Sequence, residues 1–214
     1  GSEALGMVLK KHFPWCEVWE PELGQLFREY VDRKQAQNVL DYDDLLLYWY
    51  FLLQDEQMAG VIGDQFEHVL VDEYQDTNNL QAGILLGLRH NNKNITAVGD
   101  DAQSIYSFRS ATVRNILDFP EHFPGTKVVK LEQNYRSVQP ILETTNRVIA
   151  QAGERHAKAL WSLRKGGQRP RLIECLDENR QDEAVVEQVL EHYEQGIPLQ
   201  RQAVLFRAAW HSNS

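Results

Sequence analysis

The stretch over residues 68–78 reads HVLVDEYQDTN, and it places a short apolar run directly before two adjacent carboxylates, Asp72 and Glu73. Such a run is typical of a buried parallel strand, which would bring both carboxylates to its carboxyl edge. In open α/β sheets the ligand crevice lies at that edge. A neighbouring Asp and Glu there suit nucleotide hydrolysis, in which one carboxylate holds Mg²⁺ and the other activates water. Taken alone, the pattern also fits a solvated strand end.

The segments on either side predict an alternation of strands and helices. A helix is expected over residues 79–88 and a second strand over residues 95–98, and this order favours a parallel α/β sheet. Residues 3–60 are expected to be mainly helical, because apolar residues recur there at helical spacing. The aromatic residues at positions 42 and 48–51 fit core packing better than a platform for stacked bases.

A break in the pattern at Pro120, Pro124 and Gly125 is expected to link two lobes. Beyond this break the pattern predicts strands over residues 127–131, 171–175 and 203–206, and helices over residues 138–152 and 181–193. The basic segment 155–169 is expected to be a loop with a solvated surface.

The composition limits the classes of protein to which this chain can belong. The chain has 214 residues, a formal net charge of −9 and two cysteines, Cys16 and Cys175. The cysteines have neither zinc-binding spacing nor a disulfide framework, which fits a reducing cytoplasm, and no apolar run is long enough to span a membrane. The acidic charge argues weakly against a nucleic-acid partner, although the charge of a whole chain says little about a local groove.

Two further blocks follow residues 68–78 and carry a resemblance. They read NITAVGDDAQSIYSFRSA over residues 94–111 and LEQNYRS over residues 131–137. In order and spacing, the three blocks resemble motifs II, III and IV of the UvrD/Rep/PcrA group of superfamily 1 DNA helicases. LDYDDLL at residues 40–46 and AVLFRA at residues 203–208 are similar to two further elements of that family. The resemblance implies α/β, partial RecA-like motor domains, ATP and Mg²⁺ as cofactors, and movement along single-stranded DNA.

The resemblance also implies roles for residues of the first two blocks. Asp72 and Glu73 would form the metal site, with Asp72 holding Mg²⁺ through water and Glu73 acting as the catalytic base. Gln103 would sense the γ-phosphate and couple the ATP site to the DNA site, because an amide can contact both the phosphate and the attacking water. Gln75 would also belong to the nucleotide site and would help communication between the lobes.

The third block would contribute Tyr135 and Arg136 to the nucleotide site. Arg136 stands where the family carries an arginine finger, and a planar guanidinium suits bidentate binding of a phosphate. Tyr135 would stack on the adenine. Tyr106, Phe108 and Arg109 would form the DNA side, because aromatic residues that alternate with a cation fit a path of stacked bases. The same alternation also fits a half-buried strand.

The pattern G-x-x-x-x-G-K-[ST], which cradles phosphates, is absent from the 214 residues, as are the family's motifs V and VI. We therefore expect an internal fragment of a 3′–5′ DNA helicase that is inactive alone. Its expected parts are a helical segment (1–60), the later part of a first RecA-like domain (61–123) and the earlier part of a second (124–214). Single-stranded DNA, duplex junctions, and repair or replication proteins are the expected partners.

Two other functions fit part of the sequence. A helicase-like nucleic-acid-binding scaffold without turnover would account for the missing phosphate loop, but not for an otherwise intact catalytic set. A metal-dependent nuclease could use Asp72, Glu73, Asp76 and Asp100. In the helicase interpretation, Asp76 and Asp100 would instead orient the catalytic groups.

Overall fold

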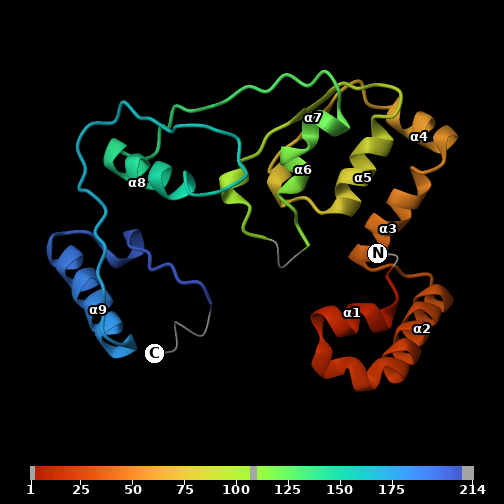
Figure 1. Ribbon diagram of the computed structural model, residues 1–214, viewed down its shortest axis with the longest axis horizontal. Coiled ribbons are helices and arrows are strands. Elements are labelled where there is room, and N and C mark those ends of the chain that lie inside the picture. Colours follow the sequence, from red (N-terminus) through yellow and green to blue (C-terminus); the bar gives the residue numbers. More distant parts are fainter. Residues whose placement is uncertain (1–2, 107–109, 209–214) are drawn as a thin grey trace. The chain divides into compact units, whose positions relative to one another are not determined.

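The computed structural model describes residues 3–106 and 110–208, and the chain divides into two compact units (Figure 1). Unit 1 comprises Gly1–Leu131 and Ala152–Lys158, and unit 2 comprises Glu132–Gln151 and Ala159–Ser214. The segment Ala152–Lys158 therefore packs with unit 1, although the residues on both sides of it in sequence belong to unit 2.

The first part of unit 1 is mainly helical, as predicted. Its elements are α1 (Leu5–His12), the 3-10 helix η1 (Pro14–Trp19), α2 (Glu20–Gln37), α3 (Tyr42–Leu52) and α4 (Glu56–Gly63). The stretch LDYDDLL starts α3. The side chain of Asp41 accepts the N–H of Asp44 at 2.9 Å, and the side chain of Asp44 accepts the N–H of Asp41 at 3.1 Å. Lys34 pairs with both carboxylates, so these aspartates stabilise the start of a helix.

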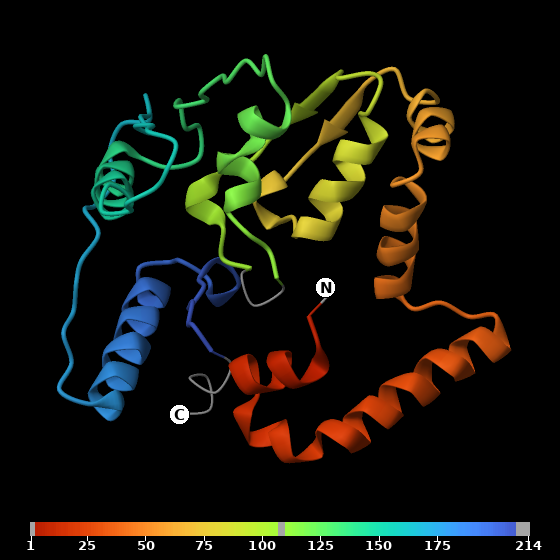
Figure 2. The same ribbon diagram turned by 45° about the vertical axis from the view of Figure 1, so that its right-hand side comes forward.

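The predicted parallel sheet is present in unit 1 as two neighbouring strands, seen as adjacent arrows in Figure 2. β1 (Val69–Val71) pairs in parallel with β2 (Ile95–Ala97), and Val69 lies opposite Ile95. Between them runs α5 (Asn79–Leu88), which has the predicted bounds. Because the strands are parallel, the residues that follow them start from the same edge of the sheet.

α3 and α4 lie beside α5 (Figure 1). One apolar cluster packs these helices together. Its buried members are Leu53 and Ala59 on one side and Ile84 and Leu88 of α5 on the other. The helices approach closely, since a Cβ added at Gly87 would lie 2.7 Å from Cβ of Leu53. Removing apolar surface from water here stabilises the side of unit 1 that carries α5.

The prediction that the aromatic residues of α3 pack in the core is wrong for most of them. Tyr50 packs against this cluster, whereas the other four are exposed: Tyr42, Tyr48, Trp49 and Phe51. These side chains surround the helix, but α3 buries only the face that it turns to α5.

The second apolar cluster joins the sheet to the helices that follow it. It is centred on Tyr74, Phe119 and Phe123, and side chains of both strands and of α5 pack against it. The rings of Tyr74 and Phe119 meet edge to face with centroids 5.2 Å apart. Three short elements complete this region: the 3-10 helix η2 (Tyr74–Asp76), α6 (Arg114–Leu117) and α7 (Phe119–His122).

Unit 2 contains the two predicted helices. They are α8 (Gln139–Ile149) and α9 (Glu178–Glu194), and a 3-10 helix, η5 (Leu199–Arg201), follows them. Asp177 caps α9, which therefore begins three residues before the predicted start. In the described part of the chain, no helix is both long enough and apolar enough to cross a membrane.

The three strands predicted after the break are not formed. Residues 127–131, 171–175 and 203–206 are irregular. Their apolar side chains are largely exposed, with Leu172 at 88% and Leu205 at 94%. A strand needs a hydrogen-bonded neighbour, and no described segment pairs with these residues. The parallel sheet therefore consists of β1 and β2 within the described residues.

Candidate active site

Two backbone hydrogen bonds connect the residues at and just beyond the carboxyl ends of β1 and β2. The N–H of Val98 donates to the carbonyl of Val71 at 2.8 Å, and the N–H of Tyr74 donates to the carbonyl of Val98 at 2.9 Å. Between these bonds, Glu73 has left-handed backbone angles, φ 51° and ψ 42°. A non-glycine residue in this region carries strain, and such strain is often found at functional sites.

This turn separates buried residues from exposed ones. Tyr74 and Gln75 are buried, with Gln75 only 1% exposed, whereas Asp72 and Glu73 are exposed. The sequence predicted that both carboxylates lie at the strand end, and the structure places them there. Asp72 is oriented by its own neighbour, because its Oδ1 accepts the N–H of Glu73 at 2.9 Å.

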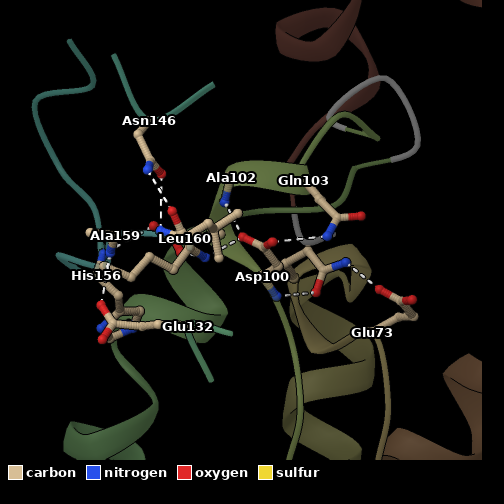
Figure 3. Close-up of polar contacts among 12 residues, drawn as sticks. Glu73, Asp100, Ala102, Gln103, Glu132, Asn146, His156, Ala159 and Leu160 are labelled. Atoms are coloured by element: carbon tan, nitrogen blue, oxygen red, sulfur yellow. Dashed lines mark hydrogen bonds and ion pairs between the residues drawn. The ribbon is translucent and has the colours of Figure 1, made fainter. Parts of the chain in front are cut away.

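Side chains from the two strand ends form one chain of hydrogen bonds, seen as dashed lines in Figure 3. Nε2 of Gln75 donates to Oε2 of Glu73 at 2.6 Å, and Oε1 of Gln75 accepts the N–H of Asp100 at 2.9 Å. Oδ2 of Asp100 accepts Nε2 of Gln103 at 2.8 Å. We call these four residues, Glu73, Gln75, Asp100 and Gln103, the amide relay. The two motif blocks therefore meet in one structure.

A short 3-10 helix and its cap hold the Gln103 end of the relay. Gln103 lies in the 3-10 helix η3 (Asp101–Gln103), and Asp100 caps this element by accepting the N–H of Ala102 at 3.0 Å. A Cβ added at Gly99 would lie 2.7 Å from Oε1 of Gln75. The glycine in the stretch VGDD therefore leaves room for the relay.

Sequence reasoning missed a lysine that binds this site. Nζ of Lys158 pairs with Oδ1 of Asp100 and lies 3.1 Å from Oδ1 of Asp101. The side chain of Lys158 is only 16% exposed, so the prediction of a solvated surface is wrong at this position. The two aspartates are 58 and 57 residues away in sequence, and no local pattern could have revealed the pairs.

Two opposing effects act on the pKa of each partner. Burial raises the pKa of Asp100, but hydrogen bonds from Gln103 and Lys158 outweigh it and hold this pKa below its ordinary value. Burial lowers the pKa of Lys158, but hydrogen bonds to Asp100 and Asp101 outweigh it and raise this pKa. Both shifts favour the charged forms, so the pair is ionised at neutral pH.

The exposed pair Asp72 and Glu73 fits a shared magnesium site. Within residues 3–106 and 110–208, no group of three or more His, Cys, Asp or Glu side chains is arranged to hold a metal ion. Mg²⁺ is usually bound by one or two carboxylates together with water and substrate phosphates, so two exposed carboxylates suffice. Asp76 lies in η2, and its buried Oδ1 has no hydrogen-bond partner among the described residues.

Tyr135 and Arg136 belong to unit 2, where a tight turn presents them. Oδ1 of Asn134 accepts the N–H of Arg136 at 2.9 Å and the N–H of Ser137 at 2.7 Å. Nη1 of Arg164 donates to the carbonyls of Tyr135 and Arg136 at 3.3 and 2.5 Å. Both presented side chains are exposed. Arg164 is a second residue that the sequence did not indicate.

Of the three residues predicted to contact DNA, the structure describes one. Tyr106 is half-buried, and it follows η3 in sequence. Phe108 and Arg109 lie outside the described residues.

Comparison with known proteins places this α/β chain in a helicase family. The UvrD/REP helicase N-terminal domain matches residues 13–124, and the UvrD-like helicase C-terminal domain matches residues 129–214. The chain therefore belongs to the UvrD/Rep helicase family. This confirms the resemblance that the three motif blocks indicated.

Similar proteins carry helicase names. ATP-dependent DNA helicase PcrA of Staphylococcus epidermidis is 36% identical over 186 residues, which cover 86% of this chain and 26% of that protein. A probable DNA helicase II homolog of Rickettsia conorii is 43% identical over 154 residues, covering 70% and 23%. DNA helicase II of Rickettsia typhi is 41% identical over 160 residues, covering 73% and 24%. The chain thus spans about a quarter of the length of these relatives.

Proposed function

We propose that this chain is part of the motor of an ATP-dependent 3′–5′ DNA helicase, in which ATP hydrolysis drives movement along single-stranded DNA. The observation that carries the proposal is the amide relay, which links Glu73 to Gln103 across the ends of two parallel strands. The helicase family and the name of the PcrA relative support the same reaction. In this proposal, the chain contributes to two RecA-like domains, divided near residue 124.

Phosphoryl transfer depends on positioning and on neutralising charge, and each residue of the site has a part in this. Bound MgATP would supply the phosphoryl group that is transferred, and its Mg²⁺ would neutralise part of the negative charge on the phosphates. Asp72 would hold the metal through water, and Glu73 would orient the attacking water and take its proton. Gln75 fixes the carboxylate of Glu73 in one direction, and Gln103 would place its amide at the γ-phosphate.

The remaining roles complete the motor. Arg136 would bring a guanidinium to the γ-phosphate, and Tyr135 would stack on the adenine. Tyr106, Phe108 and Arg109 would contact single-stranded DNA. The proposed reaction also needs a phosphate-binding loop, which the 214 residues lack. In this proposal other residues of a longer protein supply the loop, and the 214 residues alone do not hydrolyse ATP.

The test is Glu73→Gln in the full-length protein, measured as ATP hydrolysis with and without single-stranded DNA. Loss of the general base is expected to lower DNA-stimulated hydrolysis by about 100-fold or more, with DNA affinity kept. Glu187→Gln, at an exposed position on α9, is the matched control and should hydrolyse ATP like the wild type.

Two outcomes would count against the proposal. Wild-type rates in the Glu73→Gln variant would remove Glu73 from the chemistry. A wild-type protein that binds DNA but hydrolyses no ATP would instead indicate the nucleic-acid-binding scaffold.

A further inference from the structure

We propose that Lys158 is a positioning residue of the hydrolysis site, which holds Asp100 so that Asp100 in turn orients the amide of Gln103. This inference rests on the proposed ATP hydrolysis. Lys158 lies in the segment Ala152–Lys158, which belongs to unit 1 and lies outside the three motif blocks.

The carboxylate of Asp100 is held from both sides. Lys158 pairs with Oδ1, and Gln103 donates to Oδ2 at 2.8 Å. Rotation of this carboxylate would break both contacts, so a partner that fixes one oxygen also fixes the other. The backbone N–H of Ala102 adds a bond to Oδ1 but carries no charge. Lys158 is therefore the charged group that keeps Asp100 in the orientation that Gln103 uses.

Lys158 also balances negative charge at the strand ends. Five carboxylates follow the two strands: Asp72, Glu73, Asp76, Asp100 and Asp101. Lys158 is the cation that pairs with two of them, and in the described part of the chain no other lysine or arginine forms an ion pair with the five. In a partly buried site, charges interact more strongly than in water. The pair with Lys158 therefore holds Asp100 more firmly than a solvated ion pair would.

Other contacts hold the segment independently of Lys158. The N–H of His156 donates to Oδ2 of Asp101 at 3.0 Å, and Nζ of Lys130 donates to the carbonyl of Ala157. Lys130 therefore provides a matched control. Lys130→Met removes a lysine that ties down the same segment, but it leaves both aspartates with their cation.

The experiment compares variants of the full-length protein in DNA-stimulated ATP hydrolysis. Lys158→Met keeps most of the length of the side chain and removes its charge. We expect kcat to fall about tenfold while KM for ATP stays within about twofold, because the site loses orientation rather than substrate binding. Lys158→Arg should restore part of kcat, and Lys130→Met should match the wild type.

A double-mutant cycle with Gln103→Ala separates positioning from general stability. If Lys158 acts through Gln103, Lys158→Met should lower kcat much less in the Gln103→Ala background than in the wild type. An equal loss in both backgrounds would overturn the inference, and so would a raised KM or a weakened DNA affinity with kcat unchanged. If the methionine variant does not fold, Lys158→Gln takes its place in the cycle, and a wild-type kcat there would overturn the inference.

The inference and the proposed function fail in different ways. Loss of hydrolysis in Glu73→Gln together with a wild-type kcat in Lys158→Met would overturn the role of Lys158 alone. A wild-type protein without DNA-stimulated hydrolysis would overturn both.

Discussion

Oε1 of Gln75 accepts the backbone N–H of Asp100 at 2.9 Å, so a side chain that follows β1 is bonded to the backbone that follows β2. The same amide donates to Glu73 at 2.6 Å. Gln75 is buried, and water therefore has little access to replace either bond if the amide is lost. The position of the exposed carboxylate of Glu73 thus depends on a buried neighbour.

Gln75→Ala is expected to lower both stability and hydrolysis. The N–H of Asp100 would lose its acceptor, which costs about 1–3 kcal/mol in the free energy of unfolding. Glu73 would lose its fixed orientation, and hydrolysis in the full-length protein should fall. Urea unfolding and ATP hydrolysis check the two effects. Gln65→Ala removes an exposed amide that binds the carbonyl of Val61, and it should change neither property. Full activity in Gln75→Ala would contradict the relay.

Gly99→Ala is expected to lower the rate of ATP hydrolysis in the full-length protein, with a smaller effect on the free energy of unfolding. The added Cβ would lie 2.7 Å from Oε1 of Gln75 and 2.7 Å from Cδ1 of Ile116, so both side-chain ends must move. The displaced amide would no longer align Glu73 with Asp100. Gly153→Ala is the control, since its Cβ meets no atom within 4 Å. Equal hydrolysis rates in the two variants would show that hydrolysis does not depend on the position of the Gln75 amide.

Arg164→Met is expected to slow hydrolysis in the full-length protein while leaving its melting temperature nearly unchanged. Arg164 is exposed, so its loss should cost little stability, but it holds the carbonyls of Tyr135 and Arg136. Without it, the turn that presents these side chains would be less ordered. Arg169→Met, at another exposed position in the same basic segment, should behave like the wild type. A lowered melting temperature with an unchanged rate would assign Arg164 to folding instead.

Arg89→Met is expected to destabilise unit 1 by about 2–3 kcal/mol. Arg89 is fully buried, and its guanidinium donates to the carbonyls of Phe66 and Gly63 at 3.0 and 2.6 Å. Gly63 ends α4, and its carbonyl would keep only the N–H of Phe66 as a donor, while the carbonyl of Phe66 would lose the guanidinium. Urea unfolding measures the change, with the exposed Arg28→Met as control. A loss no larger than that of the control would contradict this role.

The contribution of the Asp100–Lys158 pair to the free energy of unfolding should be constant around neutral pH. The pKa of Asp100 is lowered on folding, so its contribution is present above the ordinary value of about 3.9 and is lost as pH falls through the lowered value. The pKa of Lys158 is raised, so its contribution is present below about 10.4 and is lost as pH rises through the raised value. The difference in melting temperature between wild type and Lys158→Met should therefore shrink only at the acidic and alkaline ends. A change through neutral pH would contradict these shifts.

Local sequence patterns were sufficient for one part of the fold. The apolar run before Asp72, the helix over residues 79–88 and the next strand all form where they were predicted. Each depends on periodicity, caps and breaks within a few residues, and such signals are legible in a single sequence. The placement of Asp72 and Glu73 at a strand end followed from the same signals.

The tertiary structure alone decided which distant groups meet. The strands expected at 127–131, 171–175 and 203–206 are not formed, because pairing depends on a neighbour and not on the segment itself. Lys158 reaches Asp100 across 58 residues, and Arg164 reaches the carbonyl of Arg136 across 28. The local sequence around a lysine or arginine does not show whether its side chain is solvated or bound to a distant partner. The sequence alone therefore determined the motif residues of this helicase-family chain, and folding decided which residues hold them in place.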